Sequence, residues 1–220
     1  MSSHHIVRDD QEPALIIANG AACSLELLNN LLEWNPLVIV LDSAIDRVLE
    51  LGIKVDVLIG DFDCNFDYNA YKKKQYPIEI LKIEDQNSTD LDKAIQYLIN
   101  RNIPAANIVW ATGKRMDHTF TNITNLIKYE NLIKLVILDD FSKIFLLHKN
   151  YKKWYPEKTI LSLIPVDTAE GITTKNLKYN LNNELLTLGF KPGNSNEVVA
   201  DGFVEIIHKK GHLLLMESSD

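Results

Sequence analysis

The first two thirds of the chain alternate short apolar runs with segments of helical spacing. The apolar runs, which we expect to form strands, are Ala14–Asn19, Leu37–Leu41, Val55–Ile59, Ile78–Ile83, Ile108–Ala111 and Lys134–Leu138. Apolar residues recur every three or four positions in the intervening segments Ser24–Glu33, Ala44–Leu51, Thr89–Asn100 and Met116–Tyr129. Continuous apolar strands between helices are typical of a parallel sheet that is covered on both faces. The pattern therefore predicts an α/β domain, which we place at residues 1–142.

The pattern changes near residue 140, and no amphipathic helix is evident beyond it. Stretches rich in β-forming residues follow, including Thr159–Ile164, Glu184–Leu188, Phe203–Ile207 and Leu213–Met216. Turn signals separate them at Pro165, Gly171, Asn182-Asn183, Pro192-Gly193 and Lys210-Gly211. We expect a small all-β sandwich domain over residues 143–220.

Carboxylate groups follow three of the predicted strands. Asp42 ends one apolar run, Asp61 and Asp63 follow the next across Gly60, and Asp90 comes after a third. In open α/β sheets ligands bind outside the carboxyl ends of the strands, where gathered carboxylates repel each other unless a cation lies between them. Carboxylate-rich phosphate sites usually hold Mg²⁺. An Asp-x-Asp pair on its own is more simply a polar turn, but the further acids at strand ends favour magnesium-dependent chemistry on a nucleotide.

Two helix starts carry further candidates. Thr89 and Asp90 stand where a helix begins. Ser88 or Thr89 can cap this helix, acids and hydroxyls in its first turn can stabilise its dipole, and the same N-terminus can hold a phosphate. Gly113 permits a tight turn before the next helix, where Arg115 can fork onto phosphate oxygens. His118 follows on that helix and is either a ligand contact or a histidine that braces the sheet. We expect His118, Asn122 and Asn125 on one face of this helix and a core-facing stripe opposite, made of Phe120, Ile123, Leu126 and Ile127.

Five motifs in order resemble the thiamine pyrophosphokinase family over nearly the whole chain. They are Leu41-Asp42-Ser43-Ala44, Ile59-Gly60-Asp61-Phe62-Asp63, Asp85-Gln86-Asn87-Ser88-Thr89-Asp90, Gly113-Lys114-Arg115-Met116-Asp117-His118 and Gly193-Asn194-Ser195-Asn196-Glu197. The resemblance implies a nucleotide-binding catalytic α/β domain followed by a thiamine-binding β domain. It also implies transfer of a pyrophosphoryl group from ATP to thiamine in the presence of Mg²⁺, which gives AMP and thiamine diphosphate.

The resemblance also implies roles for individual residues. Metal ligands would be Asp42, Asp61, Asp63 and Asp90, and the last three would act in catalysis together with Arg115. The nucleotide would contact Asn19, Asp42, Thr89, Arg115, Asp117 and His118. Thiamine would contact Gln86, Ser195 and Asn196 at a homodimer interface, although from the residues alone Ser195 and Asn196 form a plain β-turn.

The chain departs from the family pattern in two places. Ser43-Ala44 replaces a glycine pair that often follows the first aspartate, which predicts a less open loop near the nucleotide. The last strand reads Leu213-Leu214-Leu215-Met216, without the tryptophan that some members stack on thiamine. A stacking surface here would have to be aliphatic or come from another segment.

Composition narrows the alternatives. The net charge of -7 disfavours a nucleic-acid partner, and no apolar run approaches the ~20 residues of a membrane-spanning helix. The polar start, Met1–Glu12, resembles neither a signal nor a transit peptide, and Cys23 and Cys64 are too few for a disulfide framework. We therefore expect a cytoplasmic enzyme.

Two other functions compete with this one. A metal-dependent nucleotide-sugar transferase would also use an Asp-x-Asp pair, but it leaves the Arg115–His118 segment and the β domain unexplained. A non-catalytic nucleotide-sensing module would need no acidic cluster aimed at the phosphates.

Overall fold

The structure is a computed structural model that describes residues 12–62, 67–85 and 87–219. The chain forms two compact units, residues 1–114 and 115–220, which we call the N-terminal and C-terminal units. No helix in the described ranges is long and apolar enough to cross a membrane.

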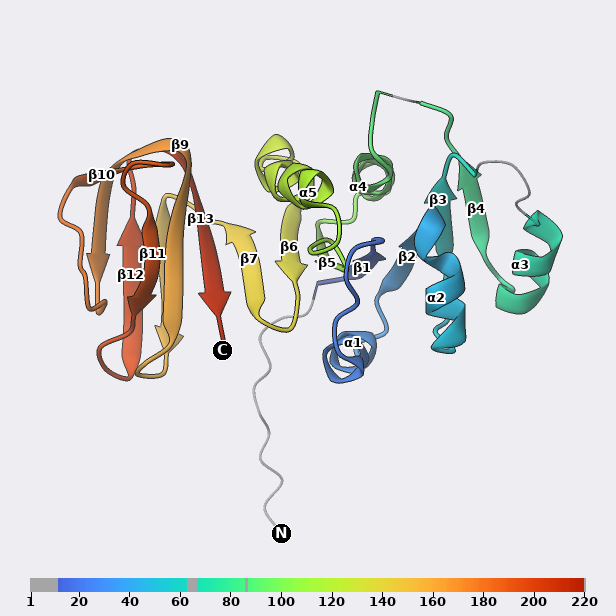
Figure 1. The fold of residues 1–220 in the computed structure, drawn as a ribbon, viewed down its shortest axis with the longest axis horizontal. Helices are drawn as coiled ribbons and strands as arrows, with labels where there is room; N and C mark the ends of the chain where they lie inside the picture. The colour runs from blue at the N-terminus through green and yellow to red at the C-terminus, as the bar shows by residue number, and fades with distance from the viewer. Residues whose placement is uncertain (1–11, 63–66, 86, 220) are drawn as a thin grey trace, which may run out of the picture. The chain divides into compact units, whose positions relative to one another are not determined.

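The N-terminal unit is built on five parallel strands in the order β4-β3-β2-β1-β5 (Figure 1). The strands are β1 (Ala14–Ile17), β2 (Leu37–Leu41), β3 (Val57–Gly60), β4 (Glu79–Lys82) and β5 (Ala105–Val109). Residues of the three central strands, β3, β2 and β1, are almost all buried, as continuous apolar runs predict. The chain moves outward from β1 to β4 and then returns to β5 on the other side of β1. The strand order therefore reverses between β1 and β5.

Helices connect these strands on both faces of the sheet. They are α1 (Leu25–Leu32), η1 (Asp42–Ala44), α2 (Ile45–Glu50), α3 (Tyr68–Gln75) and α4 (Asp90–Asn100). Because crossovers between parallel strands are right-handed, the outward-moving connections lie on one face and α4 lies on the other, as Figure 1 shows for α1 and α2 against α4. Ser24 caps α1 by accepting a hydrogen bond from the Leu27 amide at 3.2 Å, as its position predicts.

Helix α3 was not expected from the sequence, because its residues form no apolar stripe. Asp67 caps it by accepting hydrogen bonds from the amides of Asn69 and Ala70. The Tyr71 hydroxyl donates to Asp46 of α2 at 2.8 Å. Burial and this hydrogen bond raise the pKa of Tyr71 to about 12. Polar contacts therefore hold α3 in place together with an aromatic contact, in which Tyr68 packs edge-on against Phe62.

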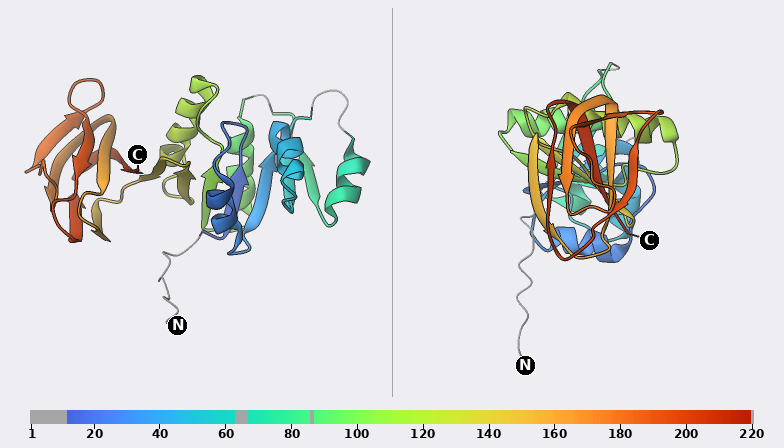
Figure 2. Two further views of the ribbon diagram at one scale, coloured as in Figure 1. Left: turned by 60° about the horizontal axis from the view of Figure 1, so that its bottom comes forward. Right: turned by 90° about the vertical axis from the view of Figure 1, so that its left-hand side faces the viewer.

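The C-terminal unit begins with a helix, and its strands pair antiparallel. The helix is α5 (Met116–Lys128), and the strands are β6 (Lys134–Leu138), β7 (Ser142–Leu146), β8 (Asn150–Tyr155), β9 (Ile160–Lys175), β10 (Glu184–Thr187), β11 (Gly193–Glu197), β12 (Gly202–Ile207) and β13 (Lys210–Ser218). Strand β9 pairs with β13, β10 and β11 in one sheet and with β12 in a second (Figure 2). Apolar residues from both sheets, among them Leu161, Ile172 and Val204, form one core. An α/β part followed by a β-rich part confirms the predicted fold class.

Strand β9 corrects one expectation. The sequence predicts turns at Pro165 and Gly171, yet β9 runs through both of them. Pro165 lies opposite Leu213 in the ladder with β13. Gly171 has φ +69°, and the register of β10 shifts beside it. The glycine therefore forms a β-bulge inside a long strand, where the sheet bends without ending.

The two compact units divide between Lys114 and Arg115. Strand β6 pairs with β7, and β7 pairs with β13, so these elements pack with the β-rich part. The functional boundary between residues 142 and 143 stays a prediction.

Candidate functional site

Asp42 and Asp61 follow the neighbouring strands β2 and β3. Gly60 lies between them: a Cβ atom added to it would stand 2.3 Å from the Cβ of Asp42 and 2.9 Å from its Cγ. The Asp42 side chain therefore packs directly on the backbone that leads into Asp61. The strand pattern predicts both acids at the same edge of the sheet, and β2 and β3, which precede them, are neighbouring parallel strands. Asp63 lies outside the described residues.

The close approach at Gly60 makes a prediction. Gly60→Ala should displace the Asp42 side chain, lower the unfolding free energy by about 2 kcal/mol and reduce turnover about tenfold or more. Gly52→Ala is the matched control, because Gly52 has nothing within 4 Å of an added Cβ and only its φ of +70° resists the change. Thermal unfolding and steady-state rates of both variants check this. Equal rates in the two variants would contradict it.

Thr89 and Asp90 form the start of α4. Thr89 Oγ1 accepts from the Asp92 amide at 3.2 Å, and Asp92 Oδ2 accepts from the Thr89 amide at 3.1 Å, which completes a capping box. The capping role expected of Thr89 is confirmed, and its phosphate role stays a prediction. Asp85 accepts from Ser88 Oγ and from the Asn87 amide, and these bonds lower the pKa of its carboxyl group. Gln86 lies outside the described residues.

Lys93 is a site residue that the sequence did not reveal. Its ammonium group donates to Asp90 Oδ1 at 3.0 Å, and the lysine side chain is only 5% exposed. A buried lysine needs a partner, because its charge is costly away from water. The spacing of three between Asp90 and Lys93 was the available signal, but a lysine on a helix is more often solvated.

The loops after β1 and β5 are fastened to each other. The Gly20 amide donates to the Trp110 carbonyl oxygen at 2.5 Å, and the Ala21 amide donates to that of Thr112 at 2.8 Å. A Cβ atom on Gly20 would stand 2.3 Å from the Thr112 carbonyl oxygen, so only glycine fits there. Lys114 Nζ donates to the Asn19 carbonyl oxygen at 3.2 Å. Asn19 therefore lies beside the turn that leads into Arg115.

Arg115 and Asp117 form a forked ion pair at the start of α5. Arg115 Nε donates to Asp117 Oδ1 at 3.1 Å, and Nη2 donates to Oδ2. These bonds hold the pKa of Asp117 at about 2. Both side chains are exposed, as is His118. The guanidinium group is thus oriented by a neighbour and still accessible to solvent.

The expected faces of α5 are partly wrong. Phe120, predicted to face the core, is 65% exposed, whereas Asn122 and Asn125 are 9% and 2% exposed. Leu126 is buried as expected. Spacing alone separates the two faces of a helix, but it does not say which face is covered.

Ser195 and Asn196 differ in what their side chains do. Asn196 is buried. Its side-chain Oδ1 accepts from the Tyr179 backbone amide at 3.0 Å, and its Nδ2 donates to the Tyr179 backbone carbonyl oxygen at 2.9 Å. Ser195 is exposed, with φ +50°, and its backbone amide donates to Ser162 Oγ. Both residues lie in strand β11, so the plain β-turn expected from the sequence is wrong. Asn196 fastens this strand to Tyr179, and Ser195 lies exposed on it.

Within the described ranges, no three His, Cys, Asp or Glu side chains are grouped closely enough to hold a metal ion. One of the four predicted ligands, Asp63, is not among those ranges, so the metal site stays a prediction.

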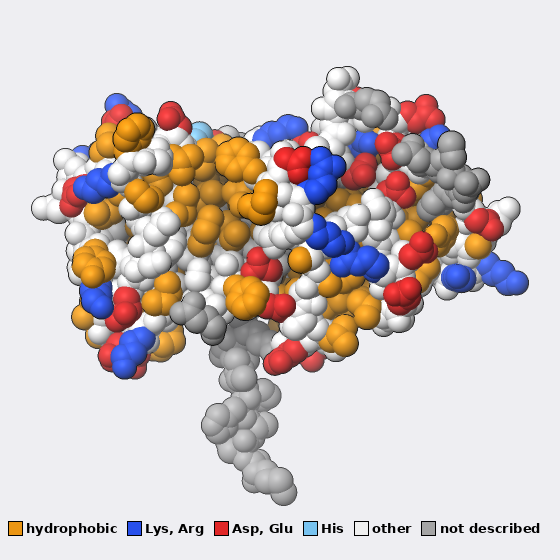
Figure 3. Space-filling model, in the orientation of Figure 1, with side chains coloured by type: hydrophobic (Ala, Val, Ile, Leu, Met, Phe, Trp, Pro, Cys, Tyr) orange, Lys and Arg blue, Asp and Glu red, His pale blue; other side chains and the backbone are white. Residues whose placement is uncertain are grey.

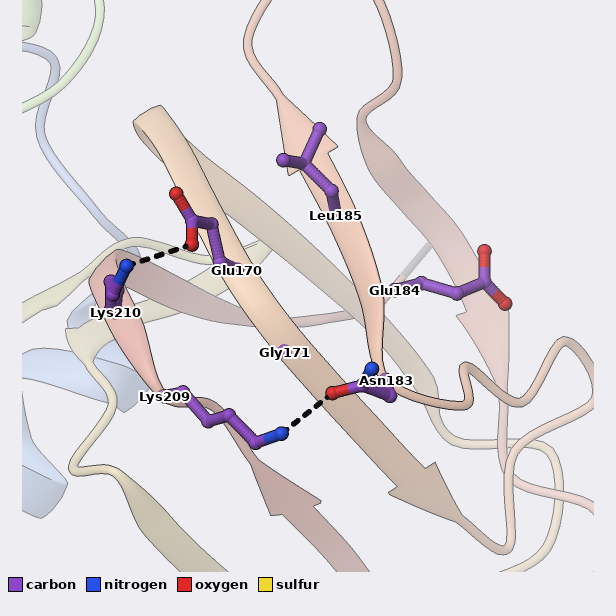
Figure 4. A pocket seen from close by; sticks show the side chains of 7 residues that line it. All are labelled: Glu170, Gly171, Asn183, Glu184, Leu185, Lys209 and Lys210. Carbon is purple, nitrogen blue, oxygen red and sulfur yellow. Dashed lines mark hydrogen bonds and ion pairs between the residues drawn. The ribbon is translucent and has the colours of Figure 1, made fainter.

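A shallow pocket of about 380 Å³ lies in the C-terminal unit, at the β9 bulge (Figure 4). Lys209 Nζ donates to Asn183 Oδ1 at 2.8 Å across it, and Lys210 pairs with Glu170 at 3.4 Å. None of the predicted site residues lines the pocket.

Comparison with known proteins covers both parts of the chain. The family model described as thiamin pyrophosphokinase, catalytic domain, matches residues 28–137, and the one described as thiamin pyrophosphokinase, vitamin B1 binding domain, matches residues 148–213. Thiamine pyrophosphokinase 1 of Oryza sativa subsp. japonica is 31% identical over 164 residues, which are 68% of this chain and 61% of that protein. Thiamine pyrophosphokinase of Bacillus subtilis is 27% identical over 215 residues, 93% of this chain and 98% of that protein.

Solved structures agree with these matches. The crystal structure of the Bacillus subtilis thiamine pyrophosphokinase has a TM-score of 0.80 at 25% identity and covers 94% of this chain and 99% of its own. The yeast thiamin pyrophosphokinase structure also has a TM-score of 0.80, with 97% of this chain and 88% of its own covered; at 20% identity it shows the fold alone. The order of the motifs, the two domain matches and the shared fold agree: this chain belongs to the thiamin pyrophosphokinase family, a family of enzymes.

Proposed function

We propose that this protein transfers the pyrophosphoryl group of ATP to thiamine. The thiamine hydroxyl oxygen attacks the β-phosphorus, the bond from that phosphorus to the α-phosphate oxygen breaks, and the products are thiamine diphosphate and AMP. One observation carries the proposal: Asp42 packs against Gly60 beside Asp61, at the carboxyl ends of adjacent parallel strands. The matches to both family domains support it.

The carboxylates suit Mg²⁺, which prefers hard oxygen ligands. Asp42, Asp61 and Asp90, together with Asp63, would hold the ion, and Gly60 leaves the room that Asp42 needs to approach. When bound, Mg²⁺ supplies positive charge to the triphosphate. Lys93 already offsets one of these carboxylates, which reduces the repulsion within the cluster.

The other polar residues position the nucleotide. The N-terminus of α4, beginning after Thr89, offers backbone amides to a phosphate. Arg115 would donate to phosphate oxygens while Asp117 fixes the plane of its guanidinium group. Asn19 and His118 complete the proposed nucleotide contacts. One of the aspartates accepts the proton of the thiamine hydroxyl.

The test is to incubate the pure protein with ATP, Mg²⁺ and thiamine and to identify the products. The proposal expects AMP and thiamine diphosphate in equal amounts, with no ADP. A nucleotide-sugar transferase would instead consume a nucleotide sugar, and a sensing module would bind ATP without turnover.

We also propose a cytoplasmic homodimer in which thiamine lies between the α/β domain of one subunit, residues 1–142, and the β domain of the other, residues 143–220. We assign the exposed Ser195 and Gln86 to thiamine, and Asn196 fastens strand β11, which carries Ser195, to Tyr179. Apolar side chains gather over the β-rich part on the face in Figure 3. Exposed apolar residues of the β-rich part, of the kind that a second subunit covers, include Leu185, Leu188 and Phe190, which are 47%, 46% and 90% exposed.

The shared site predicts complementation between variants. Gln86→Ala and Ser195→Ala should each be inactive alone, because each removes a contact from every site. After the two proteins are mixed and allowed to exchange subunits, one site of each heterodimer is intact, so up to about a quarter of the wild-type activity should return. A fully active monomer in sedimentation would refute the shared site.

A further inference from the structure

Arg47 of α2 has no assigned role, yet it lies at the point where the strand order reverses. Its Nη1 donates to Asn19 Oδ1 at 3.0 Å and to the Gly20 carbonyl oxygen at 3.1 Å. Its guanidinium carbon stands 4.3 Å from the ring centre of Trp110. One side chain thus joins the loops after β1 and β5. In open α/β sheets the crevice at this reversal is where ligands bind.

Trp110 is held in a costly conformation there. Its φ is +56°, in the left-handed region that disfavours residues with a side chain, and it is 2% exposed. Among the described residues, its indole Nε1 meets no hydrogen-bond partner. Such a residue persists only where its surroundings fix it. The stacked Arg47 and the hydrogen bond from the Gly20 amide to the Trp110 carbonyl oxygen are among the contacts that do so.

The bond from Arg47 also decides what Asn19 can offer a ligand. A carboxamide has one oxygen acceptor and one NH₂ donor. Because Oδ1 of the exposed Asn19 is taken by Arg47, the NH₂ group is left to face a ligand. Asn19 is therefore set to recognise an acceptor atom, such as a phosphate or ribose oxygen.

We propose that Arg47 is a positioning residue that orients Asn19 so that the Asn19 NH₂ group donates to the nucleotide. The inference rests on the proposed function, since it takes ATP as the ligand. It deepens that function by adding a residue that positions a nucleotide contact and that belongs neither to the carboxylates at the strand ends nor to the turn before Arg115. Lysine cannot replace arginine here, because an ammonium group does not stack and bond as a planar fork does.

The test separates the donor role from a merely structural one. Asn19→Asp keeps the oxygen that Arg47 binds, and adds a charge that favours this pair, but it removes the NH₂ donor. It should therefore unfold at or above the wild-type temperature, yet bind ATP about tenfold more weakly, the scale of one hydrogen bond. Calorimetric titration with Mg-ATP in the absence of thiamine measures this without turnover.

Substitutions at Arg47 complete the experiment. Arg47→Met should raise the KM for ATP about tenfold and leave the KM for thiamine unchanged, and Arg47→Lys should recover only part of the loss. Arg101→Met is the matched control. Arg101 also stacks on an aromatic ring, that of Tyr97 at 4.6 Å, and it pairs with Glu79. It lies at the C-terminal end of α4, whereas the proposed site residues lie at the N-terminal end. It should leave the KM for ATP unchanged.

The outcomes are distinct. If wild-type protein binds ATP and Asn19→Asp binds it equally well, this proposal falls alone. Equal losses in Arg47→Met and Arg101→Met also overturn it. If wild-type protein does not bind ATP, the proposed function falls and this proposal falls with it.

Discussion

Asp61→Asn should lower kcat about a thousandfold or more while the protein stays folded. The substitution removes a proposed metal ligand at the end of β3. The charge stabilisation that a bound Mg²⁺ would give to a phosphoryl group is worth several kcal/mol, or ~4 for a thousandfold effect. Asp61 is half-buried beside a loop, so its amide analogue fits without a cavity. Rates at saturating Mg²⁺, together with circular dichroism, measure the effect.

The matched control for Asp61 is Asp67→Asn. Asp67 is an acid only six positions along the chain, but its carboxylate caps α3. Losing part of that cap should cost about 1 kcal/mol of stability and leave turnover within a few-fold. Asp63→Asn should behave like Asp61→Asn. Near-normal turnover in both Asp61 and Asp63 variants would remove the metal site from the mechanism.

Arg115→Lys should reduce kcat about a hundredfold, which is the usual loss when one transition-state donor is removed. Lysine keeps the positive charge but cannot form the fork that Asp117 holds in plane. The KM for ATP should change far less than kcat if the contact strengthens as charge develops. Steady-state rates at varied ATP concentration give both constants.

A control for Arg115 has to remove an equally exposed cation. Lys175→Met does so, because Lys175 is 70% exposed and pairs with Glu205 at 2.7 Å in the same unit. It should leave both constants unchanged. Wild-type kinetics for Arg115→Lys would show that the guanidinium group makes no contact with the reacting phosphate.

Most strands and helices of the α/β part could be predicted, because buried parallel strands have continuous apolar sequences. Helix α3 could not, since polar anchors from Asp67 and Tyr71 replace an apolar stripe. The length of β9 is not evident from the sequence, because a bulge at Gly171 can be recognised only from its pairing with the neighbouring strand β10. In the sequence alone, a glycine that forms a bulge gives the same local signal as a glycine that forms a turn.

The residues of the candidate site also fall into two groups, those that the sequence could predict and those that it could not. Acids at strand ends stand out in sequence, because the strand pattern itself predicts where they meet. Arg47 and Lys93 do not, since each looks like a solvated cation on a helix surface. Their importance depends on partners far along the chain, such as Trp110, or on burial, and neither property is local. The family resemblance implies a nucleotide contact at Asn19, but it gives no reason for the orientation of the Asn19 side chain.

Strand β9 has a consequence for how the C-terminal unit opens. Because its 16 residues belong to both sheets, neither sheet can separate from the other without breaking β9 or its ladders with β12 and β13. Local fluctuations that in other sandwiches release one sheet are therefore coupled here to loss of the whole core. The backbone amides of β9 that bond to these strands should exchange with solvent only when the entire unit unfolds, which makes this strand the last part of the unit to open.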